Sequence, residues 1–189
     1  MEVSDTIRAI KGDLRLMMNG AASAAMRQRG LLYKLNFGVE LPRIKEIAAK
    51  YTPDSELALA LWKEPVRECR IMAALLQPVD EFPEDVAEVW VESIDNIELA
   101  QLTVMNLFSR LPYAPQKVFR WIADEREFVQ VCGFYLAARL LARGMEISER
   151  AGHELRDQAE AALHSPSYFV RKAAAVALEK LDEQQSGQA

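Results

Sequence analysis

The chain has 189 residues, of which half are hydrophobic and 27% are charged, a composition that excludes an intrinsically disordered chain. Its net charge of −5 disfavours nucleic-acid binding by overall charge, although residues 1–50 carry nine Lys and Arg against five Asp and Glu, a local +4. No apolar run approaches the length of a membrane span and no segment resembles a signal peptide, so we expect a cytoplasmic protein with no membrane partner.

Helical periodicity is nearly continuous along the chain, and no segment alternates apolar and polar residues as a half-buried strand would. Short turns separate the periodic segments, which predicts antiparallel neighbouring helices in an all-α protein. The expected helices cover residues 4–17, 21–35, 42–51, 54–63, 65–77, 83–94, 96–110, 115–124, 127–143, 147–164 and 167–182.

Four of these helices share one pattern: each opens on an aliphatic residue, continues through small residues and closes on Leu. Their starts are 33, 30 and 41 residues apart, at Val66, Leu99, Val129 and Val170. This spacing is typical of HEAT-type repeats, in which each helix pair buries its apolar face against the next pair. We therefore predict a single domain over residues 1–182, a right-handed α-α superhelix of HEAT-like repeats with a concave groove. Residues 183–189 are predicted to form a flexible tail.

The cysteines and histidines show no arrangement that indicates chemistry. Cys69 and Cys132 fall inside apolar helical patterns, which predicts small buried side chains rather than a disulfide or a metal site. His153 and His164 have no other ligand-type residue at a suitable spacing, so we expect both at the surface. The sequence implies no metal and no cofactor.

Three further segments have distinctive patterns. Residues 35–51 (LNFGVELPRIKEIAAKY) join an aromatic-Gly-Val-x-x-Pro entry to an amphipathic helix, and residues 57–76 (LALALWKEPVRECRIMAALL) contain Leu-Trp followed by Arg-Glu-x-Arg. Residues 90–95 (WVESID) run from an aromatic residue to an Asp. Together these segments resemble the DNA alkylation repair family, HEAT-like glycosylases that remove alkylated purines, over roughly residues 26–182.

The resemblance implies a particular chemistry. An N3- or N7-alkylated purine is cationic, so its glycosidic bond is weakened and the base leaves as a neutral molecule. A single carboxylate can then stabilise the oxocarbenium-like sugar and orient the attacking water. Aromatic side chains pack on the deoxyribose and basic residues hold the phosphates. The duplex is cradled against the groove, and the lesion need not be flipped into a pocket.

Transferred residue by residue, the resemblance assigns Asp95 as the catalytic carboxylate and Trp90 as the first aromatic residue. Val91 stands where the family has its second, sugar-packing aromatic residue, and Tyr135 takes the place of a functional Trp further along the chain. The alternatives are purely structural roles: helix capping for Asp95 and inter-helix packing for Trp90 and Tyr135.

Phosphate contacts are assigned less completely. Gln101 or Leu102 stands where the family has a phosphate-holding Arg, and the second such Arg falls near Ala138, beside Arg139. The strongest basic concentration in the chain forms either a solvated helical face or a contact to the DNA backbone. It consists of Arg27, Arg29, Lys34, Arg43, Lys45 and Lys50.

The leading interpretation is a monomeric protein that binds duplex DNA in its concave groove, with Arg27, Arg29, Lys34 and Arg139 on the phosphates. If active, it would hydrolyse the N-glycosidic bond of N3- or N7-alkylpurines through Asp95. The alternatives are a relative without catalysis that recognises damaged or branched DNA, and a HEAT-type scaffold for a protein partner, which the overall acidity favours.

Overall fold

The computed structural model describes residues 2–187, and within that range the regular secondary structure is helical apart from one isolated parallel bridge between Leu35 and Val66. The predicted all-α class is therefore confirmed. The chain divides into two compact units, one ending at Phe82 and the other starting at Pro83. We call their described parts, residues 2–82 and 83–187, unit 1 and unit 2. No helix among the described residues is both long enough and apolar enough to cross a bilayer.

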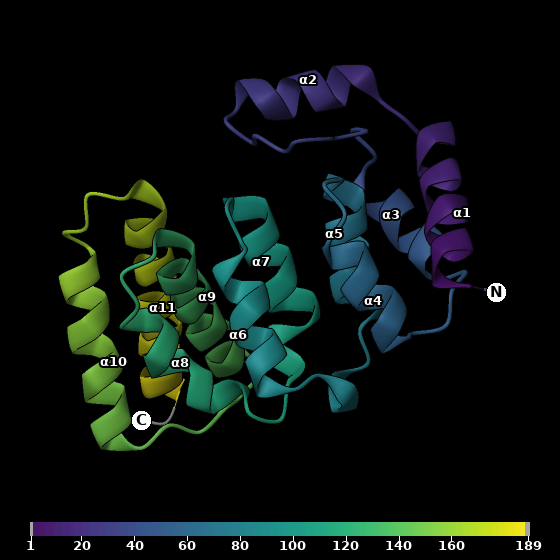
Figure 1. The fold of residues 1–189 in the computed structure, drawn as a ribbon. Coiled ribbons are helices and arrows are strands. Elements are labelled where there is room, and N and C mark those ends of the chain that lie inside the picture. Colours follow the sequence, from purple (N-terminus) through teal and green to yellow (C-terminus); the bar gives the residue numbers. More distant parts are fainter. Residues whose placement is uncertain (1, 188–189) are drawn as a thin grey trace. The chain divides into compact units, whose positions relative to one another are not determined.

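Unit 1 is built on helices whose ends follow the sequence signals. Pro42 lies in the first turn of its helix, where its missing N–H costs nothing, and Asp54 caps the next helix by accepting the N–H of Leu57 at 2.7 Å. Helix α5 packs on α3 and α4, and α1 packs on α3 and α4 (Figure 1). The elements are α1 (Val3–Leu16), α2 (Gly20–Gln28), α3 (Leu41–Ala48), α4 (Ser55–Trp62), α5 (Arg67–Leu76) and the 3-10 turn η1 (Val79–Glu81).

Helix α2 is shorter than predicted. The expected helix over 21–35 ends at Gln28, because Gly30 takes a positive φ of 88° and the chain turns there. The segment after Gly30 runs back beside α2: the N–H of Asn19 donates to the Phe37 carbonyl (2.9 Å), and the Ser23 hydroxyl donates to the Asn36 carbonyl (3.0 Å).

A buried ion pair holds the far end of that returning segment. The Glu68 carboxylate accepts the N–H groups of Phe37 (3.2 Å) and Val39 (3.1 Å). Arg67 lies 3.0 Å from the same carboxylate and donates to the Val39 carbonyl at 2.9 Å. The side chains of Arg67 and Glu68 are only 2% and 0% exposed, so the Arg-Glu sequence ties the extended segment 37–39 to the start of α5.

In unit 2, α9 is the central helix and packs against α7, α8 and α11 (Figure 1). Gly133 permits the close approach of α8, because a Cβ at this position would lie 2.6 Å from the Ile122 nitrogen. The elements are α6 (Glu84–Glu92), α7 (Ile97–Asn106), the 3-10 turn η2 (Phe108–Arg110), α8 (Ala114–Ile122), α9 (Glu127–Ala142), α10 (Glu149–Ala162) and α11 (Tyr168–Gly187). The predicted tail, 183–189, overlaps α11 as far as Gly187, and its last two residues lie outside the described residues.

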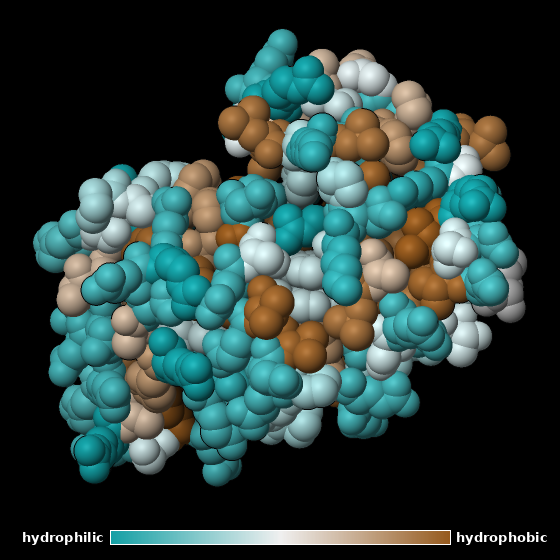
Figure 2. Space-filling model, in the orientation of Figure 1, coloured by the Kyte–Doolittle hydropathy of each residue, from teal (hydrophilic) through white to brown (hydrophobic). Residues whose placement is uncertain are grey.

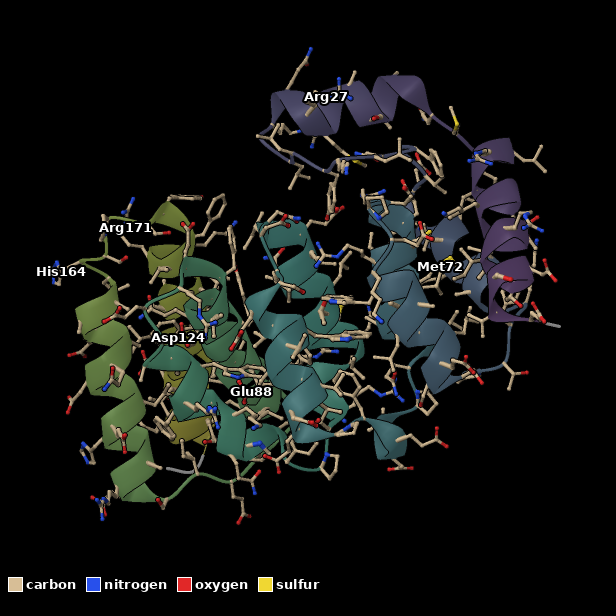
Figure 3. All side chains as sticks on the ribbon, viewed as in Figure 1. Arg27, Met72, Glu88, Asp124, His164 and Arg171 are labelled. Atoms are coloured by element: carbon tan, nitrogen blue, oxygen red, sulfur yellow. The ribbon has the colours of Figure 1, made fainter. Side chains whose placement is uncertain are left out.

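Two acidic residues of α6, Glu84 and Glu88, have a structural role in unit 2. Glu88 accepts a hydrogen bond from Lys117 at 2.8 Å and from the Trp121 indole at 3.1 Å, so it joins α6 to α8 (Figure 3). Burial raises the pKa of the Glu88 carboxyl, but the hydrogen bonds from Lys117 and Trp121 outweigh burial and leave it below its usual value. Glu84 adds a second carboxylate, 3.0 Å from the Lys117 ammonium. The carboxylates of Glu84 and Glu88 therefore take part in ion pairs within unit 2.

Candidate nucleic-acid interface

Asp95 lies in the turn between α6 and α7, and its side chain is exposed. Its Oδ1 accepts a hydrogen bond from the side-chain amide of Asn96 at 3.0 Å. Asn96, and not Asp95, caps α7, because the Asn96 side-chain oxygen accepts the N–H of Leu99 at 3.0 Å. The capping alternative for Asp95 is wrong, and its carboxylate is held at the surface by the residue that does the capping.

Trp90 does not form the exposed aromatic wall that the resemblance assigned to it. Its side chain is 2% exposed, and Val91, at the position of the second aromatic residue, is fully buried. The reason is the helical period: Ala87, Trp90 and Val91 lie three and four residues apart and form the core-facing stripe of α6. The assignment of Trp90 to a groove is corrected to a core position.

Tyr135 and Arg139 are brought together, one turn apart on α9. With α7 they line a pocket of about 340 Å³ whose walls are Gln101, Leu102, Val104, Met105, Tyr135 and Arg139. The Arg139 side chain is exposed, while the Tyr135 hydroxyl is closed to water and has no hydrogen-bond partner in the described structure.

The sequence predicted Tyr135 as an aromatic site residue and Arg139 as a phosphate contact, but it did not predict that they share a pocket. The signal was present in part, because Gln101 and Met105 are four residues apart on α7, as Tyr135 and Arg139 are on α9. What the sequence lacks is the pairing of α7 with α9 across the intervening α8, which only the fold supplies.

The basic cluster of unit 1 separates into two kinds of cation. Arg43 lies 2.6 Å from Glu46 and Lys50 lies 2.9 Å from Asp13, so both are paired. Arg27, Arg29, Lys34 and Lys45 are exposed, and none of them has a carboxylate partner in the part of the chain that the structure describes.

Three of the unpaired cations lie in a stretch of sequence without acidic residues. Residues 14–39 contain no Asp or Glu but four basic residues, Arg15, Arg27, Arg29 and Lys34, in a protein whose net charge is −5. Arg27 points outward from α2 (Figure 3), and hydrophilic side chains lie at the C-terminal end of this helix on the face drawn in Figure 2. Leu32, among these cations, is 73% exposed. We call residues 27–34, the end of α2 and the segment that follows it, the basic loop; none of its Arg and Lys side chains is paired with a carboxylate among residues 2–187.

The cysteines carry no reactivity. Both are fully buried, as predicted, and burial raises the pKa of Cys69 to about 12 and that of Cys132 far above its usual value. Both thiols therefore stay protonated and un-nucleophilic at neutral pH. His153 and His164 are exposed, as expected (Figure 3 for His164). Residues 2–187 contain no group of His, Cys, Asp and Glu side chains that could hold a metal ion.

Comparison of this chain with known proteins identifies both its fold and its family. No curated protein matches the chain in sequence. A solved structure, described as a new family of proteins related to the HEAT-like repeat DNA glycosylases with affinity for branched DNA structures, superposes with a TM-score of 0.84. At 17% identity the superposition covers 99% of this chain and 78% of that one, which confirms the predicted HEAT-like fold. The sequence model of the DNA alkylation repair enzymes matches residues 10–187, so the chain belongs to the DNA alkylation repair enzyme family.

Proposed function

We propose that this protein binds branched or otherwise distorted DNA through phosphate contacts made by its basic loop, and that it does not release bases. The observation that carries the proposal is the group of three unpaired, exposed cations, Arg27, Arg29 and Lys34, within an acid-free stretch of an acidic protein. The structural neighbour described above, which has affinity for branched DNA, supports the choice of ligand.

Phosphate binding is the role that such cations fit. A Lys or Arg that neutralises a phosphate releases a condensed counterion, and this release drives binding most strongly at low salt. Cations that already have carboxylate partners must first give up that attraction, whereas Arg27, Arg29 and Lys34 need not.

Removing the basic loop's charge is expected to weaken binding to every DNA substrate and to flatten its salt dependence. For Arg27→Ala, Arg29→Ala and Lys34→Ala combined, the slope of log K against log salt should fall by about 2.7, at roughly 0.9 per phosphate contact. The measurement is fluorescence anisotropy on a three-way junction and on linear duplex of the same sequence, over a salt series.

The matched control removes three cations that are already paired. Arg8, Arg43 and Lys50 contact Asp5, Glu46 and Asp13 at 2.9, 2.6 and 2.9 Å, and their combined Ala variant has the same net charge as the test variant. It should keep most of the wild-type slope. If the wild-type protein binds no DNA at low ionic strength, DNA is not the ligand and a protein-binding scaffold becomes the better function.

The absence of base release is inferred from the surroundings of Asp95. The chemistry that the resemblance implies needs aromatic groups packed on the sugar beside the carboxylate, and here Trp90 is in the core and Val91 replaces the second aromatic residue. Gln101 and Leu102 supply no cation for the adjacent phosphate. A carboxylate without these positioning groups loses much of its effect on rate.

An alkylpurine glycosylase is the second candidate, favoured by the exposure of Asp95 and by its freedom from a capping role. In that reaction water forms the new bond to C1′ of the sugar, the glycosidic bond breaks, and its electron pair leaves with the cationic purine and neutralises it. Asp95 would stabilise the positive sugar and take the proton of the attacking water.

Asp95→Asn separates the two candidates. The substitution removes the negative charge but keeps the shape of the side chain and an oxygen that can accept the Asn96 amide. We expect wild type and variant alike to release 7-methylguanine from alkylated duplex DNA at the uncatalysed rate, measured by chromatography of the freed base. Release by the wild type that falls by about a hundredfold or more in the variant would establish the glycosylase.

A further inference from the structure

The pocket between α7 and α9 has the composition of a site for a small planar ligand. Its volume of about 340 Å³ lies at the lower end of the roughly 300–1,000 Å³ typical of ligand sites. Leu102, Val104 and Met105 line it from α7 with apolar side chains, and Tyr135 lines it from α9 with an aromatic ring. Apolar side chains beside an aromatic ring suit a flat, weakly hydrated group.

The polar groups of the pocket are few and lack partners. Gln101 and Arg139 are exposed, and the side chain of neither makes a hydrogen bond or ion pair within residues 2–187. The Tyr135 hydroxyl is buried and also without a partner. A buried polar group without a partner is rare in a native protein, and a polar occupant that drew this hydroxyl into the pocket would give it one.

These features fit a nucleobase better than other small ligands. A base offers two π-faces for stacking on Tyr135 and an edge of donors and acceptors for the Gln101 amide. In a nucleotide the base is linked through its deoxyribose to a phosphate, which matches the unpaired Arg139 guanidinium, one helical turn from Tyr135.

We propose that this pocket takes the base of a single unpaired nucleotide, such as one displaced at a branch point or in a bulge. The inference rests on the proposed function and names the feature of branched DNA that is recognised. Paired bases do not enter the pocket because their hydrogen-bonding edges and their faces are already engaged in the duplex. An unpaired base can leave the stack at little cost in free energy. Binding in a pocket also differs from the cradling of an intact duplex that the family resemblance implies.

The test compares two DNA duplexes that share sequence and backbone, one with a single bulged thymidine and one with an abasic bulge at the same place. The wild-type protein should bind the thymidine bulge about tenfold more tightly, the scale of one base stacked on an aromatic side chain. Equal dissociation constants for the two duplexes would overturn the pocket while leaving DNA binding intact. Failure to bind either duplex at low salt would overturn the proposed function and the pocket together.

A pair of variants locates the effect. Leu102→Trp fills the pocket and should bring the ratio of the two dissociation constants close to one, with binding to the abasic bulge unchanged. Val89→Trp places the same indole on α6, where the side chain is 65% exposed and lines no part of this pocket, and should keep the tenfold ratio. A tenfold ratio that survives in Leu102→Trp would place the base elsewhere and contradict the proposal.

Discussion

Glu68→Ala should lower the free energy of unfolding by about 3–5 kcal/mol, the cost of breaking a buried ion pair from one side. The change leaves the Arg67 guanidinium, 2% exposed, without the carboxylate that lies 3.0 Å away. It also removes the acceptor of the Phe37 and Val39 N–H groups, both buried. Since about 1 kcal/mol corresponds to roughly 2–4 °C in a chain of this length, the thermal midpoint should fall by on the order of 10 °C.

The matched control for Glu68→Ala is Glu46→Ala. Glu46 also pairs with an Arg, at 2.6 Å, but both side chains are more than half exposed, so its loss should cost less than about 0.5 kcal/mol. Urea unfolding followed by circular dichroism measures both variants. Similar midpoints for the two variants would mean that the Glu68 carboxylate does not hold the segment 37–39, and that the Arg-Glu sequence has another role.

The parts of the fold that the sequence predicted are those fixed by local chemistry. Asp54 and Pro42 mark helix starts because a carboxylate accepts orphan N–H groups and a proline lacks one. Cys69 and Cys132 are buried because they lie on apolar helical stripes. The predicted end of α2 was wrong because two signals competed there. Apolar periodicity predicted a helix as far as residue 35, whereas the turn at Gly30 ends the helix at Gln28.

The candidate site was predicted less well because it depends on which helices meet. Asp95 and Asn96 are both good capping residues, and one residue of register decides that Asn96 caps α7 and that Asp95 faces solvent. Trp90 was placed from the resemblance, but the spacing of Ala87, Trp90 and Val91 already indicated a core stripe. The pocket of Tyr135 needs the packing of α7 on α9, which no local pattern encodes.

Gly38→Ala should cost about 3 kcal/mol or more, for two separable reasons. Gly38 has a φ of 73°, where a side chain is strained by roughly 1–2 kcal/mol. A Cβ would also lie 2.1 Å from the carbonyl oxygen of Asn19, the N-cap residue of α2, and 2.8 Å from the backbone nitrogen of Ser23 in its first turn. Backbone cannot turn aside as a side chain can, so α2 must move away from residues 36–38.

Gly30→Ala isolates the first of these reasons. Gly30 has a φ of 88°, but a Cβ there would meet no atom within 4 Å, so the variant should lose only the roughly 1–2 kcal/mol of backbone strain. Hydrogen exchange should show the amides of α2 opening more readily in Gly38→Ala than in Gly30→Ala. DNA binding should follow the same order, because α2 and the segment beside it position Arg27, Arg29 and Lys34. Equal losses of stability in the two variants would mean that α2 can move away from Gly38 at no cost in free energy. The close contact at Gly38 would then not hold the basic loop in place.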